Sequence, residues 1–162
     1  MPRVYVSTYK KYSEGSIKGK WLYLRDYDDH NDFLRACREL HADEADPEFM
    51  FCGHEDIPRE FVGECYIKPD FWDYMKCDID DSVKEAFMYL FDEWNEDRCR
   101  DNYINQFRNR AELAESLMDS TVELDKVPER IARYFDYDAY GRDLELGGDV
   151  CEHNRHWFWR NY

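Results

Sequence analysis

Three residues near the C-terminus have the chemistry of metal ligands: Cys151, His153 and His156. Alternation along a β-strand would place Cys151 and His153 on one face, and a fourth ligand would have to come from a distant residue such as His54 or Cys52. Structural zinc sites usually have paired ligand spacings at both ends, and this chain has no Cys-x-x-Cys. We therefore expect polar strand residues here, with no bound metal and no cofactor. A small metal-binding or redox protein is an alternative that metal analysis would test.

The sequence contains no motif that would define an enzyme. It lacks the P-loop, the dinucleotide-binding G-x-G-x-x-G, the G-x-S-x-G of serine hydrolases and the H-E-x-x-H of metalloproteases. Carboxylates are so frequent that a pair at catalytic spacing arises by chance and is not informative. The short basic patches at Lys10-Lys11 and around Lys18 and Lys20 are expected to be solvated turns. These observations favour a binding protein that does not itself bind nucleic acid.

The acidic residues are the dominant feature of the composition. Thirty-seven Asp and Glu against 22 Lys and Arg give a formal charge of −15, with segment charges of −4 for residues 1–56, −6 for 57–100 and −5 for 101–162. A terminal acidic run would indicate disorder, but here the acids are mixed with apolar residues and must cover a folded body. Such a body repels nucleic acid and attracts proteins that bind nucleic acid, although many soluble proteins are also acidic.

The length of 162 residues suits one domain or a few very small ones. An aromatic content of 17% is ample for a packed core. No apolar run approaches the roughly 20 residues of a membrane span, and the N-terminus lacks the apolar region of a signal peptide. We therefore expect a cytoplasmic protein with no membrane contact, whose six cysteines are reduced.

Periodicity predicts a small α+β unit over residues 1–56. Alternating, β-rich segments predict strands at 3–7, 20–24 and 49–53. Between the first two strands, Gly15 and Gly19 indicate turns. Asp28 or Asp29 can cap a helix that runs to about residue 41.

Residues 57–100 are predicted to be helical. Short aromatic-rich pieces over residues 57–75 precede a stronger helix, in which Ser82 and Glu85 match the S-x-x-E capping box. Its apolar face follows helical spacing and comprises Val83, Ala86, Phe87, Leu90, Phe91 and Trp94.

Residues 101–162 are predicted to form a second α+β unit. We expect a strand at 102–107 and a helix at 111–121, in which Leu113, Ala114, Leu117 and Met118 point inward. Pro128 suits the first turn of another helix. After a Gly147-Gly148 turn, residues 150–162 predict a hairpin that reverses at 153–155. The prediction is thus an α+β protein with three small domains.

The outward faces of the predicted helices are rich in carboxylates. We expect a continuous negative surface whose members are Asp80, Asp81, Glu85, Asp92, Glu93, Glu96, Glu112, Glu115 and Asp119.

A C-terminal block resembles the antirestriction motif of the ArdA family. The block begins at Val127-Pro128 and Ala132 and continues through Tyr134, Phe135, Asp136, Tyr137, Ala139, Tyr140, Gly141, Arg142, Asp143 and Leu144. The N-terminus is also similar, with Val4-Tyr5-Val6 followed by Tyr12, Gly15, Gly19 and Trp21. A strand over residues 49–56 matches the family in position, so the resemblance covers the whole chain.

The resemblance implies a DNA-mimic inhibitor that occupies the DNA-binding site of type I restriction-modification enzymes, on their methyltransferase and specificity core. It also implies an elongated homodimer of three-domain chains, encoded on mobile DNA, with the motif in a dimer-forming segment. Two chains at −15 match the charge of about 15 base pairs of duplex. The alternative is an acidic adaptor for another basic or DNA-binding protein.

Overall fold

The computed structural model describes residues 1–121 and 123–160. The chain forms two compact units, Met1–Asp78 and Ile79–Tyr162. In the described residues each unit contains helices and one three-stranded antiparallel sheet, which confirms the predicted α+β class. The three-domain division stays a prediction, with its boundaries at residues 1–56, 57–100 and 101–162.

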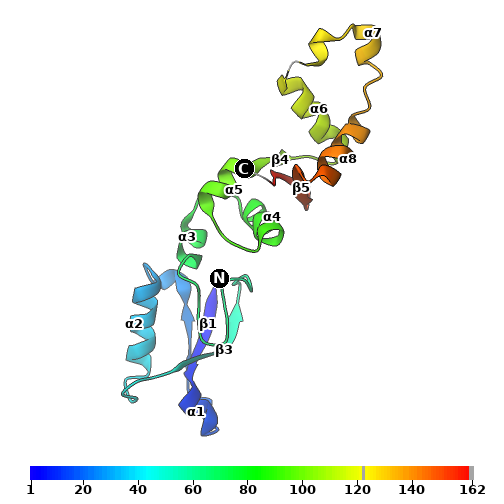
Figure 1. Ribbon diagram of the computed structural model, residues 1–162. Coiled ribbons are helices and arrows are strands. Elements are labelled where there is room, and N and C mark those ends of the chain that lie inside the picture. The colour runs from blue at the N-terminus through cyan, green and yellow to red at the C-terminus, as the bar shows by residue number, and fades with distance from the viewer. Residues whose placement is uncertain (122, 161–162) are drawn as a thin grey trace. The chain divides into compact units, whose positions relative to one another are not determined.

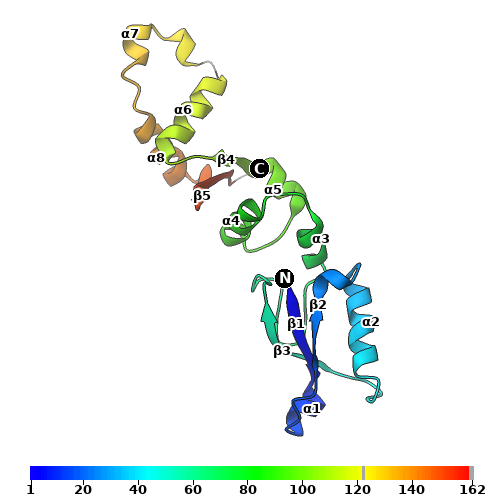
Figure 2. The same cartoon turned by 180° about the vertical axis from the view of Figure 1, so that it is seen from behind.

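An antiparallel sheet of order β2-β1-β3 forms the centre of the first unit. Its strands are β1 (Arg3–Thr8), β2 (Lys20–Tyr23) and β3 (Phe49–Glu55), which confirms the three predicted strands. Helix α2 (His30–Leu40) lies beside this sheet in both views (Figure 1 and Figure 2). Its buried Phe33 packs against Phe51 of β3, with ring centroids 5.9 Å apart. The Asp29 side chain caps α2 by accepting a hydrogen bond from the N–H of Asp32, as predicted.

The first unit also contains a helix that the sequence analysis missed. Helix α1 (Tyr9–Ser13) directly follows β1, where only turns were expected. Thr8 caps it by accepting a hydrogen bond from the N–H of Lys11. The only buried residue of α1 is Lys11, so the helix has no apolar periodicity that could have revealed it. A 3-10 turn (Leu24–Asp26) and helix α3 (Phe71–Lys76) complete the unit.

The second unit is built on a sheet of order β4-β6-β5. Its strands are β4 (Tyr103–Gln106), β5 (Val150–His153) and β6 (His156–Trp159). Both the predicted strand near residue 103 and the C-terminal hairpin are therefore confirmed, and residues 161 and 162 of that hairpin lie outside the described residues. Asn154 and Arg155 have φ of 52° and 69°, as a two-residue turn with both residues left-handed requires.

Helix α4 (Asp81–Phe91) packs on this sheet, with Phe87 and Phe158 of β6 5.8 Å apart between ring centroids. The sequence prediction for α4 is wrong in two details, the N-cap residue and the position where the helix ends. The N-cap is Asp80 instead of Ser82, because the Asp80 carboxylate accepts hydrogen bonds from both the N–H and the hydroxyl of Ser82.

The helix also ends earlier than its apolar spacing suggested. Asp92 has a left-handed φ of 57° and terminates α4, so Trp94 lies beyond it. Trp94 is still buried, because its ring meets Phe87 edge-on at 6.0 Å. Asn95 then caps a further helix, α5 (Glu96–Asn102), which the sequence analysis did not separate from α4.

The predicted helix at 111–121 is confirmed as α6 (Arg110–Thr121), which buries Leu113, Ala114 and Met118. A 3-10 turn (Leu124–Lys126) and the one-turn helix α7 (Glu129–Ala132) follow, and neither has a buried residue. Helix α8 (Tyr137–Gly147), to which the sequence analysis assigned no element, then packs against α6. We call residues 123–136 the excursion (Figure 1).

Candidate functional site

The nine predicted carboxylates all lie in the second unit, on or beside α4, α5 and α6. Seven are exposed, whereas Glu96 and Glu112 are half-buried. Asp80 serves as a helix cap, and hydrogen bonds from Ser82 hold the pKa of its carboxyl below the ordinary value. The structure therefore places most of the predicted set at the surface, where a partner can reach the carboxylates.

Four of the nine carboxylates are paired with a base of the same unit. The pairs are Asp81–Lys84 at 2.7 Å, Glu93–Arg98 at 2.6 Å, Glu96–Arg100 at 2.7 Å and Glu112–Arg108 at 3.3 Å. A neighbouring cation offsets part of the field of each of these carboxylates. They are therefore weaker attractors for an external cation than unpaired carboxylates.

The other four exposed carboxylates of the set are Glu85, Asp92, Glu115 and Asp119. In the part of the chain that the structure describes, none of them forms an ion pair. An unpaired carboxylate can accept charge-assisted hydrogen bonds from Lys or Arg of a partner, as a phosphate does. These four are the strongest candidates for direct contact, a distinction that the sequence alone did not make.

Several residues in and beside the C-terminal motif take part in α8 and in its contact with α6. Asp136 caps α8 by accepting a hydrogen bond from the N–H of Ala139 at 2.9 Å. The guanidinium of Arg110 donates to Asp138 at 2.9 Å and lies 3.7 Å from Glu145, so one side chain of α6 bridges two points on α8. The hydrogen bond from Arg110 lowers the pKa of Asp138.

Gly141 lies where α8 crosses the start of α6. A Cβ at this position would lie 2.5 Å from the carbonyl oxygen of Arg110, closer than real Cβ atoms approach. The close approach of the Arg110 backbone therefore leaves no room for a side chain at Gly141. Leu144, one turn further along α8, packs against the buried cluster that contains Leu113 and Trp157.

The aromatic residues of the motif divide into two groups. Phe135 packs edge-on against Tyr137 at 5.0 Å and Tyr140 at 5.7 Å, and all three are half-buried. Tyr134 is instead 74% exposed and Ile131 is 54% exposed. Exposed Arg142 and Asp143 approach each other only to 4.0 Å, so both remain accessible at the surface.

The three candidate metal ligands near the C-terminus have separate partners. His153 stacks on Tyr89 with ring centroids 3.7 Å apart, and Nδ1 of His156 lies 3.1 Å from the hydroxyl of Tyr103. Cys151 is buried, with Sγ 3.8 Å from the carbonyl oxygen of Phe158. Among the described residues, these side chains form no group whose donor atoms are close enough to share a metal ion. The structure therefore gives the metal-binding alternative no support.

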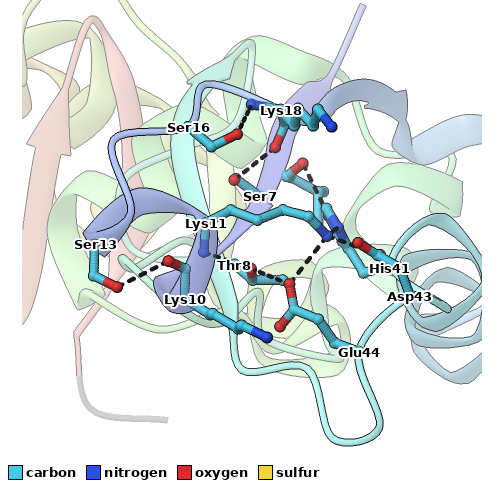
Figure 3. Close-up of polar contacts among 11 residues, drawn as sticks. Ser7, Thr8, Lys10, Lys11, Ser13, Ser16, Lys18, His41, Asp43 and Glu44 are labelled. Atoms are coloured by element: carbon cyan, nitrogen blue, oxygen red, sulfur yellow. Dashed lines mark hydrogen bonds and ion pairs between the residues drawn. The ribbon is translucent and has the colours of Figure 1, made fainter.

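A different polar cluster lies in the first unit, around the buried ammonium of Lys11 (Figure 3). Its Nζ is 2.9 Å from Nδ1 of His41, 2.9 Å from Asp43 and 3.0 Å from Glu44. Burial alone would lower the pKa of Lys11, but the hydrogen bonds to Asp43 and Glu44 outweigh it and the pKa is raised. The donor atoms of His41, Asp43 and Glu44 lie within 4.8 Å of one another, and Lys11 already supplies a cation to them. We call this group the Lys11 cluster, and we assign it a structural role.

Together the geometry describes an acidic α+β protein, with carboxylates on the outside of two units and with aromatic and ion-paired residues holding the helices in place. A family model for the antirestriction protein ArdA matches residues 4–158, and the chain therefore belongs to the ArdA family of antirestriction proteins. A comparison with curated proteins gave no significant match. Among the described residues, no helix is long and apolar enough to cross a membrane.

Proposed function

We propose that this antirestriction protein is a DNA mimic that occupies the DNA-binding site of type I restriction-modification enzymes. It would act in the cytoplasm of a bacterial host, as an inhibitor without catalysis, and would protect incoming mobile DNA from cleavage. The observation that carries the proposal is the set of exposed, unpaired carboxylates on the helices of the second unit. The family match supports an antirestriction role in general.

The spacing of these carboxylates is compatible with replacing phosphates. Glu115 and Asp119 are four residues apart on α6, which corresponds to a rise of about 6 Å. Phosphates on one DNA strand are about 3.4 Å apart along the axis, so the two spacings are on the same scale. A surface that repels DNA and attracts phosphate-binding lysines and arginines competes with DNA through its charge pattern.

Neutralising the four unpaired carboxylates should weaken inhibition. The variant Glu85→Gln/Asp92→Asn/Glu115→Gln/Asp119→Asn keeps side-chain size and should bind a purified type I enzyme about tenfold more weakly, since each exposed charge contributes a few tenths of a kcal/mol. Direct binding is measured at moderate salt, together with protection of unmodified DNA from cleavage. Competition between the wild type and duplex DNA for the enzyme tests whether both use one site.

The matched control changes the net charge by the same amount elsewhere. The variant Glu14→Gln/Glu39→Gln/Asp46→Asn/Glu48→Gln alters four exposed acids of the first unit and should bind more tightly than the variant in the second unit. If both fourfold variants lose the same affinity for the enzyme, the enzyme recognises net charge alone and the predicted surface is wrong. A complex that forms without displacing DNA would instead support the acidic adaptor.

We also propose a homodimer formed through the excursion. Ile131 and Tyr134 are three residues apart and exposed, and neither the 3-10 turn nor α7 of the excursion has a buried residue. Tyr137 and Tyr140 are less suitable probes because they pack within the chain. The variant Ile131→Asp/Tyr134→Asp should sediment as a monomer at concentrations where the wild type is dimeric. Leu146→Asp, at a residue that is 79% exposed, is the control; a dimeric double variant would place the interface elsewhere.

A further inference from the structure

The loop between α1 and β2, residues 14–19, holds an apolar side chain in solvent on a fixed backbone. Ile17 is 91% exposed. Its carbonyl oxygen accepts a hydrogen bond from the hydroxyl of Tyr5 at 2.8 Å. Figure 3 shows the next one, in which the carbonyl oxygen of Lys18 accepts from the hydroxyl of Ser7 at 2.8 Å. The N–H of Ser16 donates to the carbonyl of Lys11 at 2.8 Å. Because the loop is already ordered, a contact through Ile17 costs little conformational entropy.

The same region is the basic part of an acidic protein. Residues 1–25 contain six Lys and Arg but only one acidic residue, Glu14. Arg3 and Lys11 are paired with carboxylates, whereas Lys10, Lys18 and Lys20 are exposed and form no ion pair among the described residues. We call Lys10, Ile17, Lys18 and Lys20 the basic tip; a surface complementary to it would be apolar and acidic.

A surface of that chemistry lies on the second unit. An open hollow of about 650 Å³ is bordered by the end of α6, the excursion and the start of α8. Its apolar lining includes Leu124, Val127 and Tyr137, all half-buried and therefore still accessible. A hollow of this size has room for a branched aliphatic side chain.

Carboxylates surround this lining. Asp119, Asp125 and Glu129 border the hollow, are exposed, and form no ion pair in the part of the chain that the structure describes. The one base in the lining, Arg133, is turned to its neighbour: its guanidinium lies 5.0 Å from the ring centroid of Tyr134 and donates to the Tyr134 hydroxyl. We call this region the acidic hollow. Its apolar lining and three free carboxylates complement one isoleucine and three free lysines.

We propose that the basic tip of one molecule docks into the acidic hollow of a second copy of this chain. Ile17 enters between Leu124 and Val127, and Lys10 and Lys18 meet the carboxylates at the rim. The contact is heterologous, because each copy contributes a different surface: the copy that supplies the tip keeps a free hollow, and the copy that supplies the hollow keeps a free tip. It can therefore link copies into oligomers larger than a dimer, through a lining that does not include Ile131 or Tyr134.

Heterologous contacts can be tested by complementation between two defective variants. Ile17→Asp disables the tip and Val127→Asp disables the hollow, and each should weaken self-association beyond the dimer at least tenfold in sedimentation velocity. An equimolar mixture of the two variants should regain self-association beyond the dimer, because Ile17→Asp still offers a hollow and Val127→Asp still offers a tip. Leu146→Asp should associate like the wild type. Measurements at about 0.15 M ionic strength limit the repulsion between two acidic molecules to short range.

A charge exchange repeats the test without altering apolar residues. Lys18→Glu and Glu129→Lys should each weaken association, and their mixture should restore it, since each basic group then again faces an acidic one. The proposal is overturned if the wild type forms nothing larger than a dimer, if Ile17→Asp associates as the wild type does, or if neither mixture exceeds its separate variants. The assay contains no restriction enzyme, so its result is independent of the proposed inhibition.

Discussion

Replacing Lys11 with Met is expected to destabilise the first unit by about 3 kcal/mol, the lower end of the range for breaking a buried ion pair. The substitution removes the cation from His41, Asp43 and Glu44 and leaves their polar atoms facing an apolar chain. The Glu44 side chain is only 8% exposed and cannot recover full hydration. Asp43 is 66% exposed and can turn to water, so the expected cost is at the lower end of the range for a buried ion pair.

The measurement must be specific to the first unit. Native-state hydrogen exchange of the β1 and β3 amides in the full chain reports the opening free energy of this sheet. Lys10→Met is the matched control, because Lys10 is adjacent and exposed, and it should change that free energy by less than about 0.5 kcal/mol. Equal protection of the β1 amides in both variants would show that the Lys11 cluster does not stabilise the sheet.

The effect of Lys11→Met should also depend on pH. Hydrogen bonds from Lys11 to Asp43, and from Thr8 and Lys11 to Glu44, lower the pKa of both carboxyls in the folded protein. Their contribution to stability is therefore complete above the unfolded pKa values and is lost as the pH falls through the folded ones. The difference between wild type and variant should accordingly shrink in acid.

The elements predicted correctly are those with an apolar period. The strands of the first sheet, α2 and α6 each bury one face, and that face is visible in the sequence. Helix α1 buries only a lysine, which no hydrophobic pattern can reveal. The excess length predicted for α4 has a related cause: Trp94 fits the helical spacing and is buried, but the chain reaches that place after a left-handed turn at Asp92.

The candidate surface was predictable in part. The positions of its carboxylates follow from the polar faces of the helices, and pairs such as Glu96–Arg100 follow from their spacing of four residues. The pair between Glu93 and Arg98 depends instead on the turn between α4 and α5. The Lys11 cluster depends on tertiary structure, since 30 residues separate Lys11 from His41. Sequence alone therefore identified the acidic residues of the surface, but it did not show which of them lack an ion-pair partner among the described residues.

Replacing Gly141 with Ala is expected to cost about 2–3 kcal/mol, the upper part of the range for overpacking, although Ala is the better helix former. The added Cβ would lie 2.5 Å from the carbonyl oxygen and 2.9 Å from the carbonyl carbon of Arg110. These are backbone atoms, so no rotamer change relieves the overlap and α6 and α8 must separate. Separation would also stretch the bridges from Arg110 to Asp138 and Glu145.

The same substitution at Gly147 provides the control within the same helix. A Cβ there would come no closer than 3.4 Å to a side-chain oxygen of Asp149, and Gly147 does not have a positive φ. Gly147→Ala should therefore be neutral or stabilise α8 by a few tenths of a kcal/mol, whereas Gly141→Ala should reduce hydrogen-exchange protection of the α6 and α8 amides. Equal protection in the two variants would show that the close crossing at Gly141 is not what fixes α8. If Gly141→Ala alone loses dimerisation, the helix pair is the support that positions the excursion for its partner.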